Sequence, residues 1–98
     1  MKKIKRNAKF YVYILECRDG SYYTGYSGGL DARIKRHNQG LASKYTRVRL
    51  PVKLVWTKTC KNQRFAMRIE ARIKQLERID KERLVRGYRL DNILRRKR

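Results

Sequence analysis

The sequence predicts an α/β fold of the α+β kind, a small three-stranded, mostly antiparallel sheet flanked by helices in the order β-β-α-β-α-α. Two strand-like runs are joined by an Asp-Gly turn, which is a strong hairpin signal. A third alternating run and two stretches with helical spacing of apolar residues follow. A chain of 98 residues has room for one core. We therefore expect a single domain over residues 1–98, with its core over about 10–80 and a basic helical extension over 81–98.

The first predicted strand covers residues 10–17 (FYVYILEC) and is apolar on both faces. Because side chains alternate along a strand, one face carries Tyr11, Tyr13 and Leu15 and the other carries Phe10, Val12 and Ile14. Two apolar faces predict a strand in the centre of the sheet. The turn RDGS leads from this strand into a second strand over residues 22–27 (YYTGYS).

From Leu30 the apolar spacing changes and predicts a helix over about 30–39, which Gly40 ends. Residues 41–51 (LASKYTRVRLP) form a basic loop that closes on the only proline. Residues 52–60 (VKLVWTKTC) alternate as a third strand, with these apolar positions expected on one side: Val52, Leu54 and Trp56.

Residues 62–78 contain no Gly or Pro and predict an amphipathic helix that packs on the sheet. Its apolar stripe is Phe65, Ile69, Ile73 and Leu76. Asn62 is a candidate cap for the start of this helix, and Asp80 for a further helix over 81–95. Gly87 inside that last segment argues against one continuous helix. The final residues, RRKR, are expected to be a frayed polycationic tail.

The charge balance points to a polyanionic partner. Lys and Arg outnumber Asp and Glu by 28 to 8, which gives a net charge of +20 at neutral pH. Nucleic acid is the simplest partner, because each neutralised phosphate releases condensed counterions. No membrane association is expected, since no run approaches the roughly 20 apolar residues of a membrane span.

The remaining composition suits a cytoplasmic, nucleoid-associated protein. The charged amino end, MKKIKRNAK, is followed by a stretch that soon breaks into charge and a turn, so secretion is not expected. Cys17 and Cys60 are too few and too far apart for a zinc site. We expect both to be small hydrophobic residues in a reducing compartment.

Cleavage of a phosphodiester needs a metal ligand, a group that positions or deprotonates the nucleophile, and cations for the developing charge. Among the eight acids, Glu70 borders the buried stripe of the long helix. It either forms an ordinary surface ion pair with Lys74, four residues on, or binds Mg²⁺, which commonly takes only one or two carboxylates. Both interpretations remain open from position alone.

Two further pairs of residues are candidates for the chemistry. Arg33 and His37 are four apart on one helix face, where they form either a solvated basic face or a phosphate and proton site. Tyr13 and Tyr23 lie on consecutive strands, where they either pack in the sheet or present converging phenols.

The ordered set of these residues resembles the GIY-YIG nuclease family. YVY at 11–13, YTG at 23–25, then Arg33, His37 and Glu70 carry the resemblance, which covers about residues 10–80. HNQG, SKYT and RLPVKLVW are similar to the small single-domain bacterial subgroup. The resemblance implies a three-stranded antiparallel sheet flanked by helices and divalent-metal-dependent hydrolysis of DNA, with Mg²⁺ or Mn²⁺ as cofactor.

The resemblance also implies a role for each matching residue. Tyr13 is the general base or water positioner, Tyr23 orients water and phosphate, and Arg33 stabilises the phosphoryl charge. His37 is an accessory polar residue and Glu70 is the metal ligand. Residues of the basic loop are expected to face the nucleic acid, with loop packing as the alternative: Lys44, Tyr45, Thr46, Arg47 and Arg49.

A tyrosine base has to lose its proton, and free tyrosine has a pKa near 10. The metal, Arg33 or another cation would have to assist this loss. Some relatives carry a lysine where this chain has Tyr26, so the proton of Tyr13 is expected to leave by a different route.

The sequence leaves two functions from different classes open. The first is a metal-dependent endonuclease that acts on branched, nicked or damaged DNA in repair or recombination, with a separate protein partner as one source of targeting. The second is a non-catalytic basic module on the same fold that binds structured DNA or RNA. The charge of +20 supports binding in both cases.

Overall fold

The computed structural model describes residues 9–95. Its centre is an antiparallel sheet in the order β2-β1-β3, formed by β1 (Phe10–Glu16), β2 (Tyr22–Ser27) and β3 (Lys53–Cys60). The first strand therefore pairs with both neighbours, as its two apolar faces predict. The predicted α+β class is confirmed, and the RDGS turn does connect the two strands of a hairpin.

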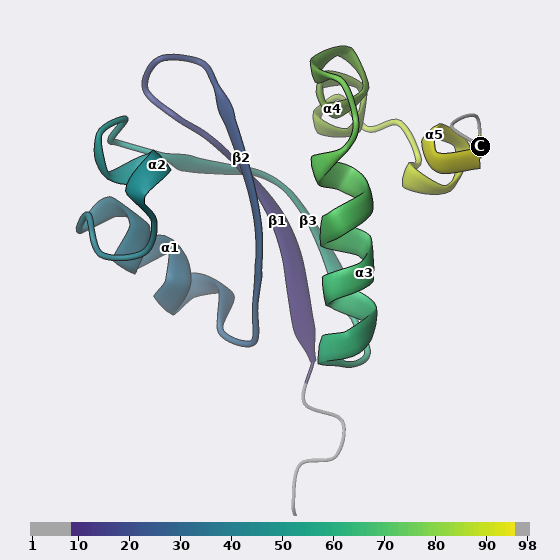
Figure 1. Ribbon diagram of the computed structural model, residues 1–98, viewed down its shortest axis with the longest axis horizontal. Coiled ribbons are helices and arrows are strands. Elements are labelled where there is room, and N and C mark those ends of the chain that lie inside the picture. The colour runs from purple at the N-terminus through teal and green to yellow at the C-terminus, as the bar shows by residue number, and fades with distance from the viewer. Residues whose placement is uncertain (1–8, 96–98) are drawn as a thin grey trace, which may run out of the picture.

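Helices cover both faces of the sheet (Figure 1). On one side lie α1 (Leu30–Asn38) and the short α2 (Lys44–Arg47), and on the other lies α3 (Gln63–Lys74). The chain then continues into α4 (Arg78–Val85) and α5 (Leu90–Arg95) on the same side as α3. The sheet is thus the middle layer, and β2 is one of its two edges.

The two faces of β1 contribute to two separate apolar clusters. Val12 and Ile14 face α3 and belong to a cluster of ten buried residues that includes Ile69, Ile73 and Leu76. Tyr13 and Leu15 face α1, and they pack with Cys17, Val52, Tyr23, Leu30, Ile34 and Leu50. Both cysteines are buried free thiols whose pKa is raised by burial, in keeping with an inert packing role.

The carboxyl-terminal half of the chain corrects three expectations. The long helix begins at its predicted cap, since Asn62 Oδ1 accepts from Phe65 N at 2.8 Å, but it ends at Lys74. Glu77, not Asp80, is the N-cap residue of the next helix, and Asp80 is buried in its first turn. The predicted helix over 81–95 is two helices, because Gly87 adopts a φ of +107° between them.

The segment from the basic loop to β3 corrects two more expectations from the sequence. The basic loop contains α2, whose N-cap Ser43 accepts from the backbone N–H groups of Tyr45 and Thr46. Val52, Leu54 and Trp56 do not share one face, because the register of β3 shifts between Leu54 and Trp56. The shift leaves Val55 as an extra residue and places Trp56 with the α3 cluster and Val52 with the α1 cluster.

One side chain fixes the entry of β3. Asn38, the last residue of α1, donates from Nδ2 to the Val52 carbonyl at 3.0 Å and accepts from Val52 N at 2.8 Å. The end of α1 is thereby tied to the chain just after the proline.

Within residues 9–95, none of the helices has the length and apolar character needed to cross a membrane. The predicted frayed tail is mostly residues 96–98, which lie outside the described part of the chain.

Candidate active site

A cleft of about 340 Å³ lies at the β2 edge of the sheet, where side chains from both faces meet. Four of the five predicted catalytic residues line it: Tyr13, Tyr23, Arg33 and Glu70. They come from β1, β2, α1 and α3, so only the folded chain brings them together. The rest of the lining is Phe10, Gly25, Tyr26, Ser27, Gly28 and Gln63.

Tyr13 reaches this cleft by lying across Gly25, its partner on β2. A Cβ atom at position 25 would stand 2.6 Å from the Tyr13 hydroxyl oxygen, closer than any real side chain is found. Glycine is needed here for the space that it leaves, because its φ is not in the left-handed region. Gly25 therefore allows the phenol of a central strand to reach the edge of the sheet.

The fifth predicted residue, His37, lies behind Tyr13 in the core and is 1% exposed. Its Nε2 is 2.9 Å from the Tyr13 hydroxyl, and its Nδ1 is 2.9 Å from Thr46 Oγ1. The Thr46 hydroxyl donates to the Ser43 carbonyl at 3.4 Å, so it accepts from Nδ1–H of His37. His37 Nε2 is then the acceptor for the Tyr13 O–H. A solvated basic face is thus ruled out for this histidine.

The protonation states of this pair follow from burial. Desolvation of the phenolate, followed by the nearby Tyr23, raises the pKa of Tyr13 to about 12, and the Arg33 guanidinium opposes this only in part. Burial, followed by the positive charge of Arg33, lowers the pKa of His37 below its ordinary value of 6.5. At neutral pH the pair is therefore a neutral phenol that donates to a neutral imidazole.

The Tyr23 ring contacts two other rings. It forms a T-shaped contact with His37, with centroids 5.1 Å apart, and Tyr45 is stacked on it at 6.1 Å with an interplanar angle of 24°. Tyr13 also meets His37 edge-on, at 5.8 Å. The packing interpretation of the two tyrosines is correct, and both residues also line the cleft.

Glu70 forms the ion pair that one interpretation expects, while its role as a metal ligand stays a prediction. Its carboxylate forms an ion pair with Lys74 at 3.3 Å and is also part of the cleft wall. Among residues 9–95, no three His, Cys, Asp or Glu side chains form a group that could hold a metal. A single carboxylate fits a hydrated Mg²⁺ or Mn²⁺ whose other ligands are water and substrate phosphate.

The five predicted nucleic-acid contacts of the loop separate into three groups. Lys44 and Arg47 project from α2 as exposed cations, and neither has a side-chain partner among the described residues. Tyr45 and Arg49 stack on each other, with the guanidinium carbon 3.8 Å from the ring centroid. Thr46 is fully buried against His37, so for this residue the loop-packing alternative is the correct one.

The predictions from the sequence missed the structural roles of three residues at this site. Thr46 orients His37, Gly25 makes room for Tyr13, and Asp19 holds Arg49 by an ion pair of 3.1 Å. The role of Thr46 had a signal in the sequence. Ser43 is a typical N-cap, and it predicts a helical turn that buries one side chain of SKYT. The role of Gly25 depends on a contact with the neighbouring strand, and that of Asp19 on a contact with a residue 30 positions further along the chain.

Comparison with known proteins gives one family. Residues 9–83 match the model of the GIY-YIG catalytic domain. A UPF0213 protein of Bacillus licheniformis is 45% identical over 83 residues, which cover 85% of this chain and 86% of the relative. A UPF0213 protein of Halalkalibacterium halodurans is 53% identical over 75 residues, covering 76% and 80%.

Solved structures agree with these sequence matches. The solution NMR structure of a UPF0213 protein from Bacillus halodurans matches with 52% identity and a TM-score of 0.52, and it covers 79% of this chain and 82% of that one. The solution NMR structure of a protein from E. faecalis matches with 35% identity and a TM-score of 0.56, and it covers 88% of each chain.

Proposed function

The chain belongs to the GIY-YIG family, and within it to the small UPF0213 proteins, and from that premise we propose that it is a metal-dependent DNA endonuclease. The observation that carries the proposal is the meeting of two phenols, a guanidinium and a carboxylate in one cleft, with a neutral imidazole bonded behind the inner phenol. Together these groups can accept a proton, stabilise developing charge and hold a metal ion, which are functions that assist phosphodiester hydrolysis.

In the proposed reaction, Tyr13 and His37 act together on the attacking water. The Tyr13 oxygen accepts a proton from the water as its own proton passes to His37 Nε2, 2.9 Å away. The water oxygen bonds to phosphorus, the bond to the leaving oxygen breaks, and that oxygen takes up a proton from solvent. A free phenolate never forms, so the raised pKa of Tyr13 does not prevent the reaction.

Arg33 and Tyr23 act on the phosphate in this proposal. The Arg33 guanidinium can donate to two phosphate oxygens at once and offsets the charge that develops on them. Tyr23 lies beside it in the cleft wall and orients the phosphate and the water. The positive charge of Arg33 also helps to keep His37 neutral, and hence able to accept the proton.

Glu70 is the proposed ligand for Mg²⁺ or Mn²⁺. A bound ion of this kind supplies positive charge that stabilises the leaving oxygen. Glu70 would hold it by one carboxylate, in place of the present contact with Lys74 Nζ at 3.3 Å.

The proposed substrate is branched, nicked or damaged DNA in repair or recombination. Contacts to backbone phosphates position a protein without reading sequence. Exposed cations lie on the helices of both layers, which suits a broad phosphate-contacting surface: Lys35, Arg36, Lys44, Arg47, Arg64 and Arg68. A separate protein partner could direct the enzyme to its site.

A non-catalytic DNA- or RNA-binding module is the alternative function. The engagement of the Glu70 carboxylate by Lys74 favours it, and the net charge of +20 is compatible with both functions. Binding alone would not require a phenol bonded to a neutral histidine beside a carboxylate, so the endonuclease remains the better account.

The test uses labelled duplex, single-stranded, nicked and branched DNA with Mg²⁺, Mn²⁺ or EDTA. Wild type is expected to cut at least one of these DNAs only when metal is present. Glu70→Gln should abolish cutting while binding persists, and Glu77→Gln, which removes an exposed carboxylate away from the cleft, should cut like wild type. Binding without cleavage under every condition would favour the non-catalytic module.

A further inference from the structure

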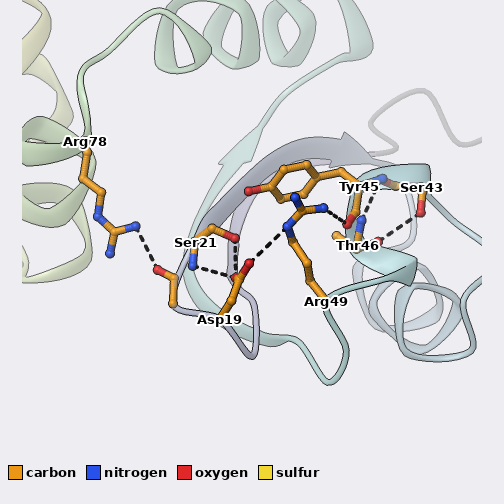
Figure 2. Close-up of polar contacts among 8 residues, drawn as sticks. Asp19, Ser21, Ser43, Tyr45, Thr46, Arg49 and Arg78 are labelled. Carbon is orange, nitrogen blue, oxygen red and sulfur yellow. Dashed lines mark hydrogen bonds and ion pairs between the residues drawn. The ribbon is translucent and has the colours of Figure 1, made fainter.

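Four side chains form a continuous contact chain from the β1–β2 turn to the cleft, and we refer to them as the Tyr45 column: Asp19, Arg49, Tyr45 and Tyr23. Asp19 Oδ2 accepts from Arg49 Nε at 3.1 Å, and the Arg49 guanidinium carbon lies 3.8 Å from the Tyr45 ring centroid. The Tyr45 ring in turn stacks on Tyr23 with centroids 6.1 Å apart. Figure 2 shows Arg49 between the Asp19 carboxylate and the Tyr45 ring.

Two of the three guanidinium nitrogens of Arg49 are hydrogen-bonded in this arrangement. Besides its bond to Asp19, its Nη1 donates to the Tyr45 carbonyl at 2.8 Å, and its flat face covers the Tyr45 ring (Figure 2). Such a guanidinium combines stacking with two directed hydrogen bonds, which an ammonium group cannot reproduce. A cation held in this way is less available to a phosphate than a free one.

The Asp19 carboxylate, the other partner in this ion pair, is also held by hydrogen bonds. Asp19 Oδ1 accepts from the Ser21 hydroxyl at 2.6 Å and from Ser21 N at 3.0 Å. These bonds, ahead of the Arg49 charge, hold the pKa of the Asp19 carboxyl below its ordinary value, so the carboxylate stays ionised. The same turn is bonded from α4, where Arg78 Nη1 donates to the Gly20 carbonyl at 2.8 Å (Figure 2).

The other end of the column meets the reacting groups. Tyr23 lines the cleft and contacts the edge of His37, and it adjoins Tyr13 closely enough to raise that residue's pKa. The helix that supplies Tyr45 also supplies Thr46, which is bonded to His37. One short helix therefore touches the active site twice, through the two rings that flank Tyr13.

We propose that Tyr45 and Arg49 are positioning residues for the endonuclease reaction, which hold the Tyr23 ring in place in the cleft and do not themselves bind DNA phosphate. The inference rests on the proposed function and assigns the column a role within it. In this account Lys44 and Arg47, the exposed cations of the same helix that have no side-chain partner within residues 9–95, make the phosphate contacts.

The two roles predict different kinetics. Loss of a phosphate contact raises Kd and lowers the slope of log Kd against log salt by about one. Loss of a positioning contact lowers the rate of a single turnover at saturating DNA, because misplacement of a reacting group slows the chemical step. Kd with its salt slope, and the single-turnover rate at saturating DNA, are measured for four variants: Tyr45→Ala, Tyr45→Phe, Arg49→Ala and Arg47→Ala.

Tyr45→Ala and Arg49→Ala are expected to lower the single-turnover rate by roughly ten- to a hundredfold, with Kd and its salt slope close to wild type. Tyr45→Phe keeps the stacked ring and should restore the rate. Arg47→Ala should raise Kd and reduce the salt slope. Thermal unfolding of each variant identifies any that has lost its fold.

A second readout does not need catalysis. With ring-¹³C-labelled tyrosine, the Tyr23 resonance is assigned from its absence in Tyr23→Phe. It should shift in Tyr45→Ala and Arg49→Ala but remain in place in Arg47→Ala. If wild type cuts no DNA, the proposed function fails, and this resonance still decides whether the column holds Tyr23.

The proposal is overturned if Arg49→Ala raises Kd, lowers the salt slope by about one and leaves the turnover rate at saturation unchanged. It is equally overturned if the Tyr23 resonance does not respond to Tyr45→Ala. In either case Arg49 and Tyr45 would be contacts to DNA or ordinary surface residues.

Discussion

Tyr13 and His37 form the pair on which the proposed chemistry depends. Burial alone makes Tyr13 a poor base, since it raises the pKa of the phenol to about 12. The same burial keeps His37 neutral and gives the phenol an acceptor at 2.9 Å. In the proposed mechanism, this neutral acceptor takes the place of the cation that a lone tyrosine base would need.

The pH dependence of cleavage should reflect His37. Only neutral His37 can accept the proton, and its pKa in the folded protein lies below 6.5. The single-turnover rate should therefore be level above about pH 6.5 and fall as the pH drops through the pKa of His37. Tyr13 should add no alkaline limb below about pH 12.

The measurement is a pH profile of single turnovers at saturating DNA, for wild type and for His37→Gln. The variant should be slower and should lack the acid limb that belongs to the imidazole. An unchanged acid limb in His37→Gln would show that another group titrates.

At the level of the elements, the site depends on the room that Gly25 of β2 leaves for the side chain of Tyr13 on β1. Gly25→Ala should displace the Tyr13 ring, because its new Cβ would stand 2.6 Å from the hydroxyl oxygen. We expect a loss of about 1–3 kcal/mol in the free energy of unfolding and a slower cleavage step.

Gly29→Ala is the matched control for this substitution. Nothing lies within 4 Å of a Cβ at position 29, and its φ of −134° suits any residue. Denaturant unfolding and single-turnover rates of the two variants should differ clearly. Equal behaviour would mean that the space above Gly25 is not what places Tyr13.

The break between α4 and α5 gives another prediction at this scale. Gly87 has a φ of +107°, which other residues adopt only with strain. Gly87→Ala should lower the free energy of unfolding by about 1–3 kcal/mol. The cleavage rate should be unaffected, since Gly87 is not part of the cleft. Chemical denaturation measures the free energy of unfolding of Gly87→Ala, and a value equal to that of wild type would contradict the prediction.

The sequence predicts these elements unequally. The central strand, the hairpin and the helix that Asn62 caps follow from local patterns, and the structure confirms them. The shift in β3 does not follow, because it depends on how Val55 fits against its partner strand. The break at Gly87 was signalled by the glycine itself, but its conformation is set by the packing of the helices on either side.

The same distinction holds for the site. Spacing alone leaves Tyr13, Tyr23, Arg33, His37 and Glu70 open as site residues, and the family resemblance groups them; the structure brings them together, while their catalytic roles stay predictions. The bond from Thr46 to His37 and the stacking of Arg49 on Tyr45 depend on where the 44–49 segment folds back. A prediction of basic residues in a loop cannot distinguish a cation that faces solvent from one already held by Asp19.

For the molecule as a whole, the net charge of +20 should dominate the affinity for DNA. Binding of all variants should weaken steeply with salt, by roughly 10³-fold or more between about 50 and 200 mM if six or more phosphates are contacted. Fluorescence anisotropy with labelled DNA over a series of salt concentrations measures this slope. A weak salt dependence would contradict a broad phosphate-contacting surface.

The central claim is that Tyr13 takes part in cutting DNA, and Tyr13→Phe tests it most directly. The measurement is the single-turnover cleavage rate at saturating DNA with Mg²⁺, beside wild type and Tyr88→Phe, which alters an exposed tyrosine away from the cleft. We predict a loss of roughly 10²- to 10⁴-fold for Tyr13→Phe, with unchanged Kd, and no loss for Tyr88→Phe. Cleavage by Tyr13→Phe at the wild-type rate would contradict the account.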